Sequence, residues 1–133
     1  MARPRFEERF NLADYFLFDR LEEGLGAQVA VRFGAREYTY ADVAQRTLRL
    51  AGALQQLGVR PEERVLVILP DTPPFVWSIF ATLRIGAVLT MGNADAPAGD
   101  LAYLVSYTRA SVVITLPRVA ESIRDAHAAA SPI

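Results

Sequence analysis

The chain of 133 residues contains no cysteine and no lysine. Without cysteine it can form no disulfide, no thiolate nucleophile and no zinc–sulfur site. All 14 basic side chains are arginine, so the chain supplies no Schiff-base lysine and no lysine that binds a phosphate or a carboxylate. Chemistry that depends on cysteine or lysine therefore needs a segment outside these residues.

The sequence also lacks an excess of charge and a long apolar run. The net charge is −1, so no electrostatic attraction to nucleic acid or to an anionic membrane is expected. No apolar stretch approaches the roughly 18 residues of a membrane span, and the start, MARPRFEERF, lacks the apolar core of a signal peptide. With 52% hydrophobic and 22% charged residues, the composition indicates one globular core. We therefore expect a soluble cytoplasmic protein without nucleic-acid or membrane partners.

The first part of the chain predicts a helix followed by a β-hairpin. Residues 1–10 are expected to be a flexible lead-in, and Asn11 can cap a short helix that ends at Gly24. Apolar residues cover most of the circumference of this helix, so it should be covered on more than one side. Residues 28–33 and 36–40 alternate between apolar and polar side chains around a Gly-Ala turn, which is typical of a hairpin.

A longer amphipathic helix is predicted next. Thr39 and Asp42 form a T-x-x-D pattern close to a capping box, and Gly58 is expected to end the helix. The side chains expected on its inner face recur at helical spacing, and they are Val43, Thr47, Leu50, Leu54 and Leu57.

From Arg64 onward, strands and helices alternate. Residues 64–69, RVLVIL, form an apolar run typical of a strand that is buried on both faces. Thr72 can cap the helix that follows, with Pro73 at its first position, and Gly86 should end it. The residues expected on the inner stripe of this helix are Val76, Ile79, Phe80 and Leu83.

Two more strands and two more helices continue the pattern. The expected ranges are a strand over 87–91, a helix over 100–109, a strand over 111–115 and a helix over 117–129. Because strands and helices alternate with short links, the sequence predicts an α/β fold with parallel strands. The fold class is a partial parallel sheet of β-α-β-α-β-α order, preceded by the N-terminal helix and the hairpin.

Four polar residues lie where two predicted strands end, the edge at which open parallel sheets bind ligands. Asp71 and Thr72 follow the first of these strands, and Asn93 and Asp95 follow the second. Asp71 or Asn93 could contact a ligand. The alternative, which we favour, is that Asp71 and Thr72 cap a helix and that Asn93 holds a turn.

Other candidate sites carry little signal. The single histidine, His127, near the end of the last predicted helix, has no acidic or nucleophilic neighbour in the sequence. Gly24-Leu25-Gly26 lacks the third glycine of a dinucleotide-binding loop and precedes a hairpin. No acid–base dyad is assigned, and the carboxylate pairs expected to be solvated are Glu7-Glu8, Glu22-Glu23 and Glu62-Glu63. The aromatic side chains expected to pack rather than to stack on bases are Tyr15, Phe16, Phe18, Phe75, Trp77 and Phe80.

Three patterns follow one another along the middle of the chain. They are Thr39-Tyr40-Ala41-Asp42-Val43, then L-x-x-L-G-V-x-x-E-E-R-V over residues 54–65, then A-x-x-x-x-G-A-V over residues 81–88. Their order and spacing resemble the N-terminal part of the adenylate-forming acyl- and aryl-CoA ligases. The segments 11–34 and 69–88 look most like the benzoate-CoA ligase branch of that family. The resemblance extends over nearly the whole chain.

The chain departs from the family pattern at two loops. Pro61-Glu62-Glu63 replaces the usual glycine-aspartate turn, and Ala94 replaces the neighbour of the family's asparagine, which Asn93 matches. We expect these departures to change the shape of the loops rather than the fold.

The resemblance implies that residues 11–133 are part of an incomplete N-terminal adenylation-type domain. The family's phosphate-binding loop ending in lysine, its acidic residue that binds the ATP ribose, its hinge and its C-terminal lysine are not in this sequence. No catalytic, cofactor-binding or metal-binding residue is therefore carried over onto this chain. The implied partners are the remainder of the parent chain, which would use ATP, Mg and coenzyme A, and a small aromatic carboxylic acid; a homodimer is possible.

Two hypotheses remain open from the sequence. In the first, the chain is the N-terminal fragment of an aryl-CoA ligase whose substrate is benzoate-like, with a medium-chain fatty acid as the alternative substrate. In the second, it is a free-standing, non-catalytic interaction or scaffold module derived from such an enzyme. A fragment should expose an unpaired sheet edge and apolar helix faces, and we expect it to be marginally soluble.

Overall fold

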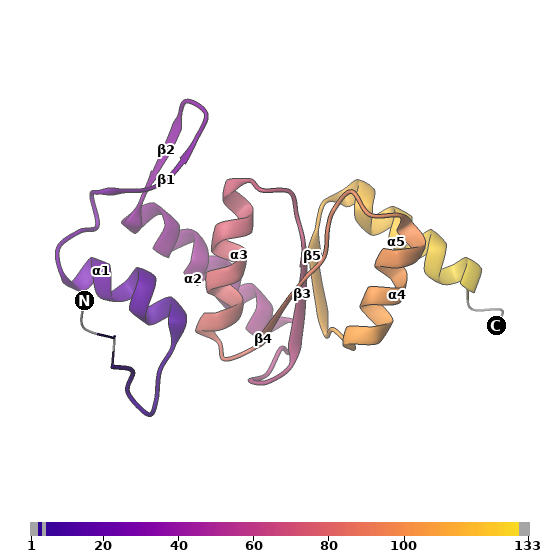
Figure 1. Ribbon diagram of the computed structural model, residues 1–133, viewed down its shortest axis with the longest axis horizontal. Coiled ribbons are helices and arrows are strands. Elements are labelled where there is room, and N and C mark those ends of the chain that lie inside the picture. Colours follow the sequence, from indigo (N-terminus) through magenta and orange to yellow (C-terminus); the bar gives the residue numbers. More distant parts are fainter. Residues whose placement is uncertain (1–2, 4, 131–133) are drawn as a thin grey trace.

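The computed structural model describes residue 3 and residues 5–130 of the chain. A three-stranded parallel sheet lies between two layers of helices (Figure 1). The strands of this sheet are β3 (Arg64–Ile68), β4 (Val88–Met91) and β5 (Val112–Thr115). The helices are α2 (Tyr40–Gln56) and α3 (Pro73–Arg84) on one face, and α4 (Ala98–Thr108) and α5 (Pro117–Ala130) on the other. The predicted α/β class, the order of the elements and the parallel strands are confirmed.

The N-terminal helix is capped as predicted but begins with an unexpected π-helical segment. Oδ1 of Asn11 accepts a hydrogen bond from the backbone N–H of Ala13 at 2.9 Å. The next residues form η1 (Asp14–Phe18), a π-helix, which continues into α1 (Asp19–Glu22). The side-chain amide of Asn11 also donates to the carbonyl oxygen of Leu83 at 2.8 Å, so the helix start is tied to the end of α3.

The predicted lead-in lies partly outside the described residues, since residues 1, 2 and 4 are not among them, and neither are 131–133. Within the described part, the Phe6 and Phe10 rings lie 4.7 Å apart, centroid to centroid. The Phe10 ring lies 5.4 Å from the ring of Tyr15 in η1. The lead-in therefore contacts the N-terminal helix through aromatic rings.

The predicted hairpin is present as β1 (Val29–Phe33) and β2 (Arg36–Thr39), which pair antiparallel. Gly34 in its turn has a φ of +58°, a conformation that glycine adopts without steric cost. In Figure 1 the hairpin extends away from the helices. Its Tyr38 reaches back to Trp77 of α3, with ring centroids 5.6 Å apart, and the Arg46 guanidinium lies 5.0 Å from the Trp77 centroid.

The capping box predicted at the start of α2 is confirmed. The backbone N–H of Asp42 donates to Oγ1 of Thr39 at 3.1 Å, and the backbone N–H of Thr39 donates to the Asp42 carboxylate at 2.9 Å. The backbone hydrogen bond from Thr39 is the main reason why the pKa of Asp42 lies below its usual value. Gly58, with a φ of +88°, ends the helix as expected.

The prediction that Leu57 lies on the inner face of α2 is wrong. Leu57 is 69% exposed, although Leu54, one turn earlier, is only 1% exposed. Leu57 is already the C-cap residue, so the chain turns toward Gly58 there and the helical stripe no longer faces the sheet. The buried residues of α2 are Val43, Ala44, Thr47, Ala51 and Leu54.

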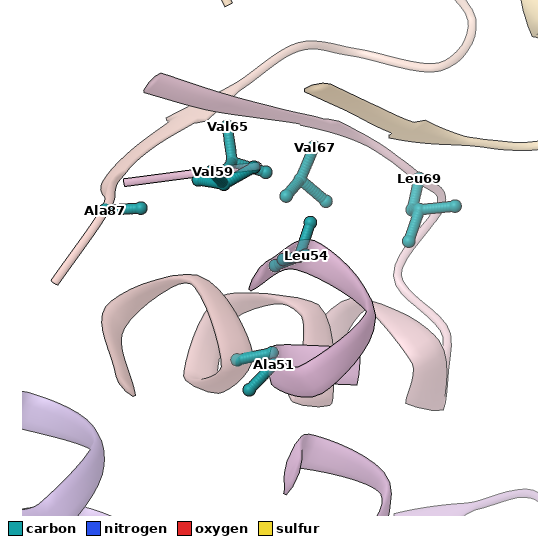
Figure 2. Close-up of a cluster of buried hydrophobic side chains, with 8 residues drawn as sticks. Ala51, Leu54, Val59, Val65, Val67, Leu69 and Ala87 are labelled. Carbon is teal, nitrogen blue, oxygen red and sulfur yellow. The ribbon is translucent and has the colours of Figure 1, made fainter. Parts of the chain in front are cut away.

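Strand β3 is the centre of the sheet, whose order is β4-β3-β5. Its side chains alternate between the two helical layers because successive strand residues point to opposite faces. Val65 and Val67 contact the core under α2 and α3, and Figure 2 shows Leu54 pointing toward Val67. Leu66 and Ile68 belong to the core under α4 and α5. All four are fully buried, which confirms a strand covered on both faces.

The predicted inner stripe of α3 is only half-buried, and smaller side chains replace it in the interior. Ser78, Ala81 and Thr82 are at most 1% exposed. The two hydroxyls are satisfied within the helix, since Ser78 Oγ donates to the Pro74 carbonyl at 2.7 Å and Thr82 Oγ1 donates to the Ser78 carbonyl at 2.8 Å. The side chains predicted for the inner stripe lie to either side of these three small residues. Two of them, Val76 and Phe80, pack against the cluster around Leu17.

Glu62 occupies the position of the family's glycine in the turn before β3 and has a φ of +68°. Its backbone N–H donates to the carbonyl oxygen of Gly86 at 2.8 Å. This hydrogen bond joins the turn before β3 to the turn before β4. Glu62 thus has a left-handed backbone conformation, which glycine adopts more easily than any other residue.

Within the described part of the chain, no helix has both the length and the apolar character needed to cross a membrane.

Candidate functional site

Three of the four polar residues predicted at the strand ends line one hollow of about 370 Å³, and Thr72 is not among them. Asp71 reaches it from the loop after β3, and Asn93 and Asp95 reach it from the loop after β4. The two strands pair in parallel register, so their carboxyl ends meet at one edge of the sheet. Tertiary structure thus brings together residues that are more than twenty positions apart in the sequence. The remaining lining residues are Leu69, Pro70, Phe75, Met91, Gly92 and Ala94.

Asn93 holds the turn after β4. Its Oδ1 accepts a hydrogen bond from the backbone N–H of Asp95 at 2.9 Å, and its carbonyl oxygen accepts one from the N–H of Ala96 at 3.1 Å. This geometry matches the turn interpretation, in which an Asn side chain replaces a backbone acceptor.

Gly92 is closely packed at the same edge. A Cβ atom built at this position would lie 2.8 Å from Cδ2 of Leu104 and 3.2 Å from Cγ1 of Ile68. A larger residue here would therefore require the Leu104 and Ile68 side chains to shift.

The capping role expected of Thr72 is wrong in its detail. Thr72 is the N-cap residue of α3, yet its side chain makes no capping hydrogen bond. Its Oγ1 instead donates to the Pro70 carbonyl at 3.3 Å. The reason is local, because Pro74 at the second helical position has no N–H and the N–H of Phe75 donates to the Thr72 carbonyl at 2.9 Å. Asp71 before it is exposed and lines the hollow.

The hollow does not fit a phosphate group. Its lining includes the carboxylates of Asp71 and Asp95 and no cationic side chain, so its charge repels an anion. The start of α3 offers few free amide donors, since Pro73 and Pro74 occupy its first two positions.

A second hollow, of about 320 Å³, lies between the hairpin and the start of α3. Arg32 of β1 and Asp71 both line it, beside the apolar side chains of Val31, Phe33 and Phe75. Sequence reasoning missed it, because Arg32 sits on an exposed strand whose only signal was alternation. Asp71 thus lies between two hollows of the surface.

The other candidate residues are dispersed. His127 is exposed in the last turn of α5. Gly24, with a φ of +81°, ends the N-terminal helix ahead of the hairpin, where a dinucleotide-binding loop is not formed. Among the described residues, no group of three or more His, Cys, Asp or Glu side chains is placed to bind a metal ion.

A parallel sheet covered by helices on both faces, with polar side chains where its strands end, defines a three-layer α/β protein. Residues 18–132 match the model of the family described as AMP-binding enzymes. The chain belongs to this family, and its fold is that of part of the N-terminal domain of the adenylate-forming ligases.

Individual relatives agree with this assignment. A feruloyl-CoA synthase from Amycolatopsis sp. is 36% identical over 94 residues, 71% of this chain. The 3-hydroxybenzoate/4-hydroxybenzoate–CoA ligase of Thauera aromatica is 34% identical over 99 residues, 74% of this chain. The crystal structure of a benzoate CoA ligase from Burkholderia xenovorans LB400 superposes on 89% of this chain with a TM-score of 0.79 and 31% identity.

The matched region is a small share of each relative. It spans 19% of the feruloyl-CoA synthase and 19% of the Thauera ligase. It spans 24% of the Burkholderia ligase structure. Most of the sequence of each of these relatives therefore has no counterpart among these 133 residues.

Proposed function

We propose that this chain is the N-terminal part of an aryl-CoA ligase. The whole protein would activate a benzoate-like carboxylic acid with Mg-ATP, release pyrophosphate, and transfer the acyl group from AMP to coenzyme A. The observation that carries the proposal is the match to the AMP-binding enzymes together with relatives named for feruloyl, hydroxybenzoate and benzoate substrates. A medium-chain fatty acid is the alternative substrate, and the cytoplasm remains the expected compartment.

The role proposed for the chain is structural support rather than catalysis. Adenylate formation needs cationic groups and backbone donors around the phosphates and the acyl carbon, and the hollow at the sheet edge is lined by two carboxylates instead. The chain has no lysine that could act there. We propose that residues 11–133 form one side of a domain whose catalytic and cofactor-binding residues belong to other segments.

The experiment compares the chain alone with a fusion. In the fusion, this chain replaces the matching segment of the Burkholderia benzoate CoA ligase, to which it is 31% identical. The purified chain should release no pyrophosphate from Mg-ATP and benzoate. The fusion should form benzoyl-CoA in the presence of coenzyme A.

Pyrophosphate release by the purified chain of 133 residues would contradict the supporting role. A folded fusion without activity, together with a chain that is monomeric and unfolds cooperatively by itself, would favour the free-standing interaction module. Octanoate in place of benzoate separates the two substrate classes when the full-length parent protein is assayed, because an aromatic pocket in the parent should discriminate against a flexible aliphatic chain.

A further inference from the structure

The hollow between the hairpin and the start of α3 has walls from two distant parts of the chain. Val31 and Phe33 of β1 line one side, and Phe75 and Val76 of α3 line the other. Its volume of about 320 Å³ lies at the lower end of the range for sites that bind small molecules. With two phenyl rings among these side chains, the walls suit an aromatic or branched apolar group.

Aromatic contacts hold the hairpin against α3. Tyr38 of β2 and Trp77 of α3 have ring centroids 5.6 Å apart. The guanidinium of Arg46 in α2 lies 5.4 Å from the Tyr38 centroid and 5.0 Å from the Trp77 centroid. A cation placed over two rings stabilises their contact. Because the hairpin is held in this way, both walls of the hollow are in place before a ligand arrives, and binding needs little rearrangement.

Two side chains of opposite charge line the same hollow. They are Arg32 of β1 and Asp71 of the loop before α3, and both are exposed to solvent. Asp71 belongs to none of the ion pairs within the described residues. Arg32 pairs with Glu37 of β2 through Nε, at 3.4 Å, and its guanidinium has two further nitrogens that can donate to a carboxylate. The hollow therefore offers one cationic and one anionic group that do not pair with each other.

A ligand with a single charge meets a repulsive group in this hollow. An anion would face the carboxylate of Asp71, and the two prolines that begin α3 provide no backbone N–H to offset the repulsion. A cation would face Arg32 and the positive end of the α3 dipole. A molecule with both charges can place its carboxylate near Arg32 and its ammonium group near Asp71.

We propose that this hollow binds a free α-amino acid with an apolar side chain. The side chain lies between β1 and α3, the carboxylate accepts from the Arg32 guanidinium, and the ammonium group donates to the Asp71 carboxylate. An amino acid within a peptide has neither charge, so the charges favour a free amino acid over a chain segment. The inference goes beyond the proposed function and does not depend on it, because every lining residue belongs to this chain.

Nuclear magnetic resonance of the isotope-labelled chain tests the proposal, at a concentration where sedimentation velocity shows a monomer. Phenylalanine should shift the backbone amide signals of residues 31–33 and 75–76, with a dissociation constant of about 1 mM or below. The amide signals of α5, on the other face of the sheet, should not move. Unchanged signals around the hollow at about 10 mM phenylalanine overturn the proposal.

Two analogues separate the roles of the two charges. Phenylpropionate lacks the ammonium group and phenethylamine lacks the carboxylate, while both keep the aromatic ring. Each should bind at least about fivefold more weakly than phenylalanine, because one charged group of the hollow is then left without a partner. Binding of either analogue as tight as that of phenylalanine overturns the proposal, since the hollow would then recognise only one charge or only the ring.

A pair of variants assigns each charge to its side chain. In Arg32→Gln, phenylalanine should lose its advantage over phenethylamine, and in Asp71→Asn it should lose its advantage over phenylpropionate. Arg49→Gln and Asp125→Asn make the same changes at exposed sites of α2 and α5 and should leave the affinity for phenylalanine within about twofold. Circular dichroism establishes that all four variants are folded. Unchanged discrimination in Arg32→Gln or in Asp71→Asn overturns the proposal.

Discussion

The two N-cap threonines show how neighbours decide what one residue type does. Thr39 and Thr72 occupy the same position relative to their helices. Asp42 lies three residues after Thr39. Its backbone N–H donates to the Thr39 hydroxyl and its carboxylate accepts from the Thr39 backbone N–H, so both hydrogen bonds of the capping box form. Thr72 precedes two prolines, so its hydroxyl turns back to the Pro70 carbonyl. Helix α3 therefore begins without a side-chain cap.

The variants Thr39→Ala and Thr72→Ala measure this difference. Thr39→Ala should lower the free energy of unfolding by about 1 kcal/mol, because the N–H of Asp42 loses its partner. Thr72→Ala should lower it by less than about 0.5 kcal/mol, since no capping bond is removed. Urea titration followed by circular dichroism gives both values. A larger loss for Thr72→Ala would contradict this interpretation.

Glu62 gives a second expectation at the scale of the residue. Glu62→Gly should raise the free energy of unfolding by up to about 1 kcal/mol, because a non-glycine residue is strained at a φ of +68°. The matched variant is Ala53→Gly, at an exposed site within α2, which should lower stability by about 1 kcal/mol. Thermal unfolding of both variants provides the measurement, and destabilisation by Glu62→Gly contradicts the strain argument.

At the scale of the element, each helix is defined by the surface that it covers. Helix α2 turns its leucine and alanine side chains toward β3 and its other side toward the N-terminal helix and the hairpin. Helix α3 buries hydroxyl residues because it satisfies them through its own backbone carbonyls. Larger side chains of α3, such as Phe80, pack instead against the cluster around Leu17.

Leu54 and Leu57, at the end of α2, allow the effect of burial on stability to be measured with the same side chain. Leu54→Ala removes a side chain from the core and should lower the free energy of unfolding by about 3 kcal/mol. Leu57→Ala, at a position 69% exposed, should change it by no more than about 0.5 kcal/mol. Chemical denaturation measures both. Similar losses for the two variants would show that Leu57 is buried in solution and would contradict this assignment.

At the scale of the whole molecule, apolar groups remain uncovered. Aromatic side chains are exposed at both ends of the molecule, including Phe6, Phe16, Tyr103 and Tyr107. Tyr103 and Tyr107 stack on each other along α4, with ring centroids 5.7 Å apart. Together with the free edge of β5, these surfaces are of the kind that a larger domain covers.

The chain alone should therefore bind the dye ANS and associate as its concentration rises. The fusion to the Burkholderia ligase should show less of both effects, because the added segments cover apolar surface. Fluorescence titration and sedimentation velocity provide the measurements, with the fusion as the control. A monodisperse, dye-free chain would instead support a self-sufficient module.

Much of the fold could be predicted from the sequence because local patterns encode it. The capping box at Thr39, the apolar run of β3 and the glycines that end helices act over a few residues. The prediction failed where a tertiary partner was needed. The burial of Ser78 and Thr82 depends on which helix lies opposite, which no local pattern contains. The exposure of Leu57 was missed for a local reason, because Leu57 is the C-cap residue of α2.

The candidate site, too, could be predicted only in part from the sequence. Sequence reasoning placed Asp71 and Asn93 at strand ends, and the turn made by Asn93 follows from its own side chain. That Asp71 lines one hollow together with Asn93 and Asp95 is a consequence of the pairing of β3 with β4. The hollow that contains Arg32 had no sequence signal, since it joins β1 to the start of α3, about forty residues later in the chain.

The sequence by itself determined the types and order of the elements and the family, because these follow from spacing and from interactions between near neighbours. Only the tertiary structure decided that β3 is central, that β5 lies at an edge of the described sheet beside an apolar hollow, and that Asp71 and Asp95 line one hollow. Strand order and hollows arise when distant segments pack together, and the free energy of that packing depends on all the partners at once.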